Sequence, residues 1–541
     1  MWLRKLENFK IVNATLKHTY LIVLIITATF IHSSLFSSET LPTDHWAYEI
    51  IDQLRTAGYF HELLILNRPY SREVVAQSLS KISYGITHNE IHPSDSEERL
   101  LNLLQQEFRN ELSRIQKEVV DWRHLGLWFD YRTVVDTSKI HSIPAIKGIF
   151  SLSPLKCVTI SVSSKFDKAL LDDPDYFGYK WRGLAVFTEQ AYVRWKYKSF
   201  DVLWGRDYVK WGPGETGQLI LSDASRPLDQ FGFSIQYGII RFSYLGARLN
   251  PGYLPDSTKD QLHTLTANRY LSGHRFDIAI NKRFKIGLSE MMLYGGANEG
   301  IELQYHNPFL YYHAELLNGG GANGNVILGL DAEYFPRTNW KIYAEFILDD
   351  IQVERTAMTD LEPAEYGLIT GLEHANLFGV DGANIHVEYI RITNRTYNSP
   401  NSWEKYLHRR QPLGYISGTD LEKWHIYYQQ WMKANFRFRF GIEVTRKGEG
   451  FIEKDWDTPW LTFSDEGTYS EAFPSGVVET DINPWCALKY FVRRNVILEW
   501  RYSYHQYEQY QHRKNININR WNMLFRLWVS LDQFITNYQE D

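Results

Sequence analysis

Residues 204–228 read WGRDYVKWGPGETGQLILSDASRPL, and the chain changes character around them. The stretch begins like a strand, because Phe200, Val202 and Trp204 fall on one face of an extended backbone. The strand ends at Gly212-Pro213-Gly214, where proline fixes its own φ and glycine permits positive φ. The stretch therefore predicts a sharply bent loop that carries tryptophan rings beside arginine and aspartate.

Segments of alternating polarity recur along the chain from Leu125 onward. Taken together, one face of these segments carries polar side chains, among them arginine, glutamate and aspartate, and the other carries apolar and aromatic side chains. A period of two predicts β-strands with one wet and one apolar face. The clearest segments are residues 125–136, 158–166, 340–349, 436–444, 496–505 and 520–531.

The same alternation fits two architectures. A soluble sandwich buries its apolar faces, whereas a membrane barrel turns them toward lipid and encloses its charges. About 410 residues at roughly 24 per strand and connection give about 17 strands, which favours a closed transmembrane antiparallel β-barrel of about 16–18 strands over residues 122–541. The alternative is a secreted multi-domain β protein.

Composition narrows the class of protein. The net charge of −6 gives no basic surface for nucleic acid, and aromatic residues make up 15% of the chain, as expected at a membrane–water interface. The two cysteines, Cys157 and Cys486, are too few for a disulfide scaffold and lack metal-binding spacing. They either form one long-range pair or remain unpaired.

Residues 1–38 resemble a secretory signal peptide. A basic start with Arg4, Lys5 and Lys10 precedes the apolar run Tyr20–Ile31, which is short for a membrane helix. The alternative is an uncleaved inner-membrane anchor. Export followed by barrel insertion predicts an outer-membrane protein.

Residues 39–121 predict a small periplasmic α-helical module. Ala47, Ile50, Ile51 and Leu54 recur at helical spacing before Gly58, and a second apolar face follows over residues 74–82. A capping box of Ser94 and Glu97 predicts one long helix from Asp95 to about residue 119.

The segment Asp44-His45-Trp46-Ala47, with later matches to Ala76, resembles an S-layer-homology unit. That resemblance implies peptidoglycan or another cell-wall polymer as a partner of residues 39–121. The alternative is a helical hairpin that caps the barrel.

From about Gly126 to the C-terminus the chain resembles the Wzi capsule-assembly family. The matching residues include Gly205-Arg206, Trp211-Gly212-Pro213-Gly214, Ser222 and Asn307-Pro308-Phe309, followed in order by Glu345 with Asp349-Asp350 and by Glu388-Tyr389-Ile390-Arg391. The resemblance implies an outer-membrane protein that takes part in attachment or assembly of capsular or extracellular polysaccharide.

Candidate glycan-binding or lumen-plugging residues follow from chemistry and from this resemblance. Sugars offer hydroxyls to polar groups and C–H faces to aromatic rings, although ring packing and solvated carboxylates are the simpler interpretations. The candidates are Arg206, Asp207, Trp211, Gly212, Pro213, Gly214, Ser222, Glu345, Asp349 and Asp350, with the loop aromatics Trp403, Tyr406, Trp456 and Trp460.

Other motifs predict no cofactor, metal or catalytic centre. The G-x-G-x-x-G run at residues 319–324 lacks a βαβ context and is interpreted as a loop, and His386 with Glu388 as lumen lining. The favoured function is non-covalent glycan binding at the cell surface. The rivals are a passive porin or saccharide channel, a tether between outer membrane and cell wall, and an enzyme.

Overall fold

The computed structural model describes residues 37–63, 67–117, 121–137, 139–173, 176, 178–253, 266–318, 324–352, 361–432, 435–462 and 469–537. The predicted signal peptide lies outside these ranges except for Ser37 and Ser38, as do residues 319–323 of the glycine-rich run. No described helix is both long and apolar enough to cross a membrane.

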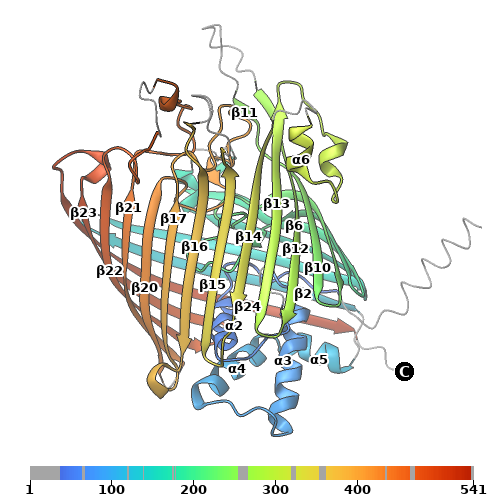
Figure 1. Cartoon of the computed structure of the whole chain (residues 1–541). Helices are drawn as coiled ribbons and strands as arrows, with labels where there is room; N and C mark the ends of the chain where they lie inside the picture. Colours follow the sequence, from blue (N-terminus) through green and yellow to red (C-terminus); the bar gives the residue numbers. More distant parts are fainter. Residues whose placement is uncertain are drawn as a thin grey trace, which may run out of the picture.

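Eighteen long strands of the described chain close into one antiparallel barrel (Figure 1), which confirms the predicted fold. Each strand pairs with its neighbours in sequence, and β2 pairs with β24 to close the ring. The strands are β2 (Asp121–Asp136), β3 (Ile140–Leu155), β4 (Val158–Asp167), β6 (Leu184–Tyr197), β7 (Phe200–Asp207), β9 (Leu228–Tyr237), β10 (Ile240–Arg248), β12 (Thr266–Asn281), β13 (Phe284–Gly296), β14 (Gly324–Tyr334), β15 (Trp340–Asp350), β16 (Glu365–Ala375), β17 (Ala383–Ile392), β20 (Leu421–Met432), β21 (Phe436–Lys447), β22 (Glu479–Arg493), β23 (Val496–Glu508) and β24 (Ile518–Asn537).

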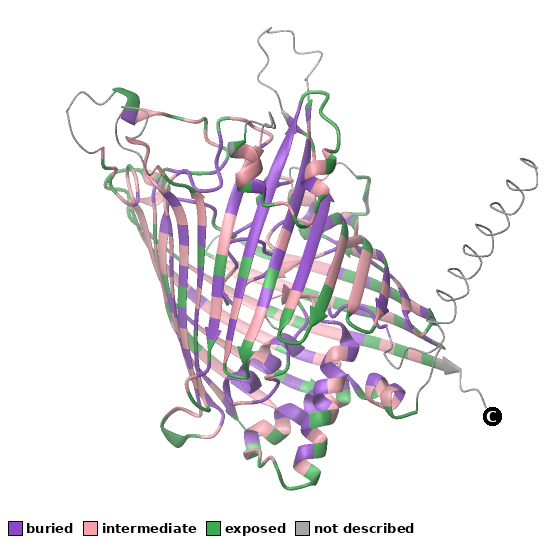
Figure 2. Ribbon diagram, turned by 45° about the vertical axis from the view of Figure 1, so that its right-hand side comes forward, coloured by how far each residue is buried: buried purple, intermediate pink, exposed green. Residues whose placement is uncertain are grey.

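The apolar faces of the strands point out of the barrel and the charged faces point in. Bands of buried and less buried residues alternate along many of the strands (Figure 2). On β15, Ile342 and Phe346 are 42% and 38% exposed, whereas Lys341 and Glu345 are 4% and 3% exposed. This inversion of a soluble protein's pattern is the one expected of a lipid-embedded barrel.

Connections at the two ends of the barrel differ in length. The short-turn end has turns such as residues 198–199, 238–239 and 494–495, and the helices of residues 47–117 lie there (Figure 1). The long-loop end has the connections 208–227, 249–265, 393–420 and 448–478. Connections at the long-loop end also carry α6 (Tyr312–Leu317) and the short strands β5 (Lys180–Trp181), β11 (Gly252–Tyr253), β18 (Leu407–His408) and β19 (Gln411–Pro412).

Strand β22 begins at Glu479 and contains a proline at position 484. Proline has no N–H to donate, but Pro484 falls in a gap in the pairing of β22 with β23, between Ile482 and Trp485. A strand therefore accommodates it.

The helical module, residues 37–117, fills the short-turn end. Its helices are α2 (Ala47–Thr56), α3 (Arg72–Thr87), α4 (Asp95–Glu107) and α5 (Arg109–Lys117). Apolar residues of all but the last of these helices form one core with Trp431 and Phe491 of the barrel wall. The capping box of Ser94 and Glu97 is present as predicted.

The prediction of a single long helix from Asp95 to about residue 119 is wrong. The helix ends at Glu107, and Phe108 leaves helical geometry with φ −94° and ψ 17°. The Phe108 ring is fully buried under the Arg72 guanidinium, which lies 4.8 Å from the ring centre. This packing turns the chain into α5, a change of direction that apolar spacing does not record.

Candidate functional site: the inner loop and the long-loop end

The loop centred on Gly212–Gly214 folds into the barrel instead of covering its rim. This inner loop, residues 208–227, leaves β7 and meets the helical module in the lumen, where β8 (Lys210–Trp211) pairs with β1 (Asn67–Arg68). The Trp211 N–H also donates to the Leu221 carbonyl at 2.8 Å, which closes the loop on itself. The inner loop and the module therefore share one backbone pairing inside the barrel.

Glu345 of β15 fixes the bend of the inner loop. Its carboxylate accepts hydrogen bonds from the N–H groups of Gly214 at 2.6 Å and Leu219 at 2.8 Å. Gly212 has a φ of +126°, and a Cβ there would lie 2.4 Å from Glu345 Oε1. The glycine is needed because the loop backbone comes this close to the wall.

Glu388 of β17 holds the next part of the loop in the same way. Its carboxylate accepts from the N–H groups of Glu215 at 2.8 Å and Thr216 at 3.1 Å, and from the Tyr343 hydroxyl at 2.6 Å. Two buried wall side chains thus accept hydrogen bonds from four loop amides, which would otherwise be buried without an acceptor.

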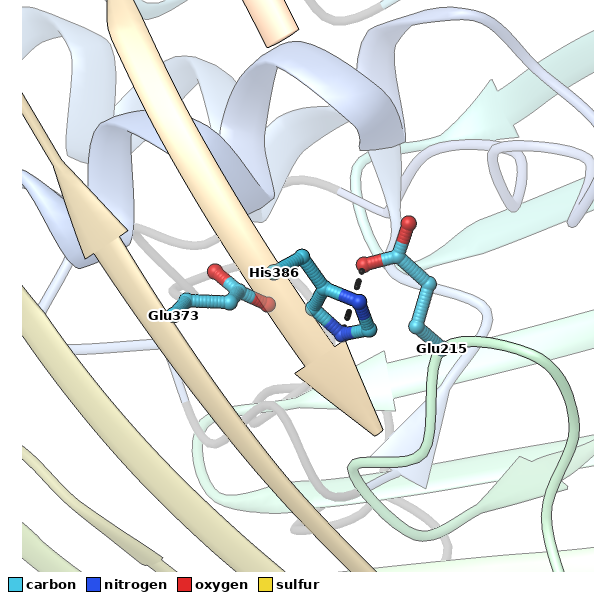
Figure 3. Close-up of side chains that lie close together, drawn as sticks. All are labelled: Glu215, Glu373 and His386. Atoms are coloured by element: carbon cyan, nitrogen blue, oxygen red, sulfur yellow. Dashed lines mark ion pairs between the residues drawn. The ribbon is translucent and has the colours of Figure 1, made fainter. Parts of the chain in front are cut away.

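Glu215, Glu373 and His386 converge in the lumen from the inner loop, β16 and β17 (Figure 3). His386 Nε2 lies 3.5 Å from Glu215, while Glu373 accepts from Lys341 at 3.0 Å and from Thr56 at 2.6 Å. Each of these three residues could give one ligand to a metal ion, but each already has a protein partner. The cluster therefore acts as a polar joint between loop, module and wall.

The charge of Glu215 fits that joint. Burial disfavours its ionised form, but the nearby His386 ring and Arg439 guanidinium outweigh burial and lower the pKa of Glu215. The Tyr427 hydroxyl donates to the same carboxylate at 2.7 Å. A cavity of about 250 Å³, lined by Glu215, Arg439, Tyr427 and other polar residues, remains between α2 and the inner loop.

The far side of the inner loop is apolar and supports the long-loop end. Leu219, Ile220 and Leu221 are buried in one cluster with residues of the 393–420 connection. The hydroxyls of Tyr397 and Tyr406 donate to the carbonyls of Leu219 and Ile220, each at 2.6 Å. The outer loops thus rest on the inner loop.

The structure places the predicted residues of the motif in three different settings. Trp211 is 2% exposed inside the apolar cluster, so its ring is not available for stacking at the surface. Asp207 is buried and accepts from Thr40 Oγ1 at 2.9 Å. Ser222 donates to the Gly414 carbonyl, whereas Arg206 lies at the rim and pairs with Asp229 through two contacts of 2.7 Å.

The remaining predicted carboxylates and aromatic residues also lie in different surroundings. Asp349 accepts from Asn325 at 2.9 Å and from the Tyr397 N–H at 2.5 Å, whereas Asp350 accepts from the adjacent Ile351 N–H. Among the loop aromatics, Tyr406 and Trp460 are buried, whereas Trp403 and Trp456 are half-buried.

Sequence reasoning missed the supports of the inner loop. Glu388 is predicted only to line the lumen, and its contacts with the Glu215 and Thr216 amides are not predicted. Nor are the hydrogen bond of the Tyr397 hydroxyl to the Leu219 carbonyl and the 3.1 Å contact between the Tyr415 hydroxyl and Thr216 Oγ1. The tyrosines of the long 393–420 connection are the signal that the sequence offers, because a ring there needs a packing surface. Cys157 and Cys486 are unpaired.

The family model for the capsule assembly protein Wzi matches residues 161–515. Among solved structures, the Escherichia coli outer-membrane protein Wzi, described as a carbohydrate-binding β-barrel involved in group 1 capsule assembly, is 16% identical with a TM-score of 0.60, and the match covers 91% of this chain and 99% of that one. Pseudomonas aeruginosa OprD is 9% identical with a TM-score of 0.44, and that match covers 78% and 98% of the two chains. No curated protein matches the chain.

Proposed function

The chain belongs to the Wzi capsule assembly family of outer-membrane β-barrels, and on that premise we propose that its long-loop end holds capsular or extracellular polysaccharide at the cell surface. The binding is non-covalent and serves attachment or assembly of the polymer. Long connections of outer-membrane barrels face the outside of the cell, so the long-loop end is the surface that meets the glycan.

The observation that carries this proposal is that the barrel is filled from both ends. The helical module packs against the wall at the short-turn end, and the inner loop packs against the 393–420 connection at the other. A filled lumen favours work at the outer surface over passage of solutes through the barrel.

Contacts between two long connections support a shaped outer surface. Lys405 Nζ donates to the carbonyls of Glu453 at 3.1 Å and Lys454 at 2.7 Å, and this ties the 393–420 connection to the 448–478 connection. The half-buried rings of Trp403 and Trp456 belong to the same two connections. Rings beside polar groups suit sugars, and repeated weak contacts along a polymer raise avidity.

Deletion of the gene tests the proposal. Polysaccharide is stained on cells and measured in the medium, and we expect it to move from the cell surface to the medium. A cell-associated layer of normal amount after deletion would refute the attachment role.

Complementation with variants then locates the surface. Trp456→Ala removes a half-buried loop ring and should reduce retained polysaccharide. Trp424→Ala removes a ring that is 46% exposed on the outward wall and serves as the matched control, with full retention expected.

The channel alternative predicts a different measurement. Purified protein in planar bilayers should show little steady conductance if the module and the inner loop stay in place, whereas a large steady conductance would favour a porin. The tether alternative predicts that the whole protein is retained on isolated cell-wall sacculi through residues 39–121. A protein that is not retained would exclude the tether.

A further inference from the structure

Three neighbouring strands end in a row of charged side chains at the rim of the barrel. Arg206 of β7 and Arg248 of β10 both lie opposite Asp229 of β9 in the strand register. Arg206 pairs with Asp229 through two 2.7 Å contacts, and the Asp229 side chain is 61% exposed. The single carboxylate of the row is thus engaged by Arg206, and Arg248 is exposed beside it.

The β18–β19 hairpin adds a third arginine. The Arg409 N–H donates to Asn250 Oδ1 at 2.6 Å, which anchors the hairpin turn next to the end of β10. Within the described residues no ion pair is formed by Arg248 or Arg409. We call Arg206, Asp229, Arg248 and Arg409 the rim patch.

A buried cation below the hairpin increases the positive potential of the rim patch. Arg269 is 3% exposed, and its guanidinium donates to the carbonyls of Trp403, Lys405 and Leu407 at 2.5–3.0 Å. Burial, with Arg409 and Arg269 close by, lowers the pKa of His408 to about 3, so that ring is neutral at neutral pH. Three arginines surround one aspartate at the surface, with a fourth beneath.

The height of the rim patch on the wall follows from the aromatic pair below it. Trp204 lies two residues before Arg206 on β7, and Phe231 lies two residues after Asp229 on β9. The two rings lie opposite each other in the strand register, and Trp204 is 68% exposed and Phe231 is 46% exposed. Exposed tryptophan on the outward wall marks the membrane–water interface. Two residues of a tilted strand rise roughly 5 Å, which places the arginines at the level of lipid headgroups.

We propose that the rim patch binds a phosphate group on the headgroup of an outer-leaflet glycolipid. Arg248 and Arg409, which form no ion pair with any described carboxylate, supply positive charge and guanidinium donors that match the geometry of phosphate oxygens. Arg206 and Asp229 hold the centre of the patch in place. The lipid chains then lie along the apolar wall below Trp204 and Phe231.

Position favours a lipid over the polysaccharide as the occupant. The rim patch shares its strand face with lipid-facing rings, whereas the half-buried rings of Trp403 and Trp456 belong to the loops that cover the lumen. An acidic sugar of a bound polymer carries related chemistry and is the competing outcome in the test.

The test measures binding of a phosphorylated glycolipid and of its phosphatase-treated form to the detergent-solubilised full chain by native mass spectrometry. The wild-type protein should prefer the phosphorylated form. The double variant R248Q/R409Q should lose about 25-fold in affinity, since each cation near a headgroup contributes about fivefold. R248K/R409K should keep most of the affinity, because the charge is retained.

A matched control is R513Q/K514Q, which removes two exposed cations from the β23–β24 connection at the same end of the barrel. Its affinity should equal that of the wild type. Equal binding of both lipid forms, or an R248Q/R409Q variant that binds like the control, overturns the proposal. Loss of acidic polysaccharide binding in R248Q/R409Q with lipid binding intact assigns the rim patch to the glycan instead.

Discussion

Replacement of Glu345 by alanine is predicted to release the inner loop from the wall. Its carboxylate accepts from the Gly214 and Leu219 amides at 2.6 and 2.8 Å in a site where Glu345 is 3% exposed. Each buried amide left without an acceptor costs about 1–3 kcal/mol, so the variant loses about 2–6 kcal/mol of loop stability. That energy corresponds to a shift of roughly 30-fold to 10⁴-fold in the local opening equilibrium.

Hydrogen–deuterium exchange of the purified protein measures this opening directly. Peptides that cover residues 209–222 should exchange faster in E345A by about the factor given above, because the two amides spend more time open. Peptides from the module and from distant strands should not change. E345Q should give a smaller effect, since one side-chain oxygen remains as an acceptor.

Asp350→Asn is the matched control on the same strand. Asp350 accepts from the neighbouring Ile351 N–H and does not contact the inner loop within the described residues. Exchange in residues 209–222 should therefore match the wild type. The reasoning is refuted if E345A exchanges as slowly as D350N.

Three further predictions concern the loop, the module and the N-terminal residues. Gly214→Ala places a Cβ 2.1 Å from the Gly217 carbonyl oxygen, so trypsin should cleave after Lys210 faster than in Gly148→Ala, which has open space around its Cβ; equal cleavage would contradict the close approach. Burial and the nearby Arg72, opposed by Glu107, lower the pKa of His45 to about 4. The unfolded chain binds a proton at His45 more readily than the folded chain, so neutral His45 contributes fully to the free energy of unfolding above about pH 6.5, and about 3 kcal/mol of that free energy is lost as the pH falls toward 4. Thermal unfolding followed by circular dichroism should show this loss of stability. His45→Gln should weaken the pH dependence. Ser37 is buried and its N–H donates to the Lys156 carbonyl at 2.6 Å, so we expect the signal peptide to be cleaved before Ser37 and not after residue 38 as the sequence pattern predicts; an intact mass that shows a start after residue 38 would contradict this.

The barrel could be predicted because the alternation of polar and apolar residues within each strand reflects which side of that strand faces lipid. Alternation at residues 340–349 matches β15, and its exposed Ile342 and buried Lys341 lie on the faces that the pattern predicts. The strand count also fell within the predicted range. Period and length suffice here, because each strand sees lipid on one side and protein on the other.

The path of the inner loop could not be predicted in the same way. Glycine and proline at residues 212–214 predict a bend, but they do not tell whether the bend points outward or into the lumen. That direction depends on Glu345 and Glu388, which are more than a hundred positions away in the chain. The burial of Trp211 follows from the same distant contacts, and no local pattern records them.

The filled interior changes what the inward-facing charges are for. Arg55 of α2 forms a bidentate pair with Glu333 of β14 at 3.1 and 2.7 Å, and both side chains are almost fully buried. In an open porin such residues tune which ions pass. Here a charge reversal at either position leaves the charge of its partner buried, with neither a counter-charge nor water. These polar positions should therefore tolerate substitution as poorly as the buried leucines of a soluble protein's core.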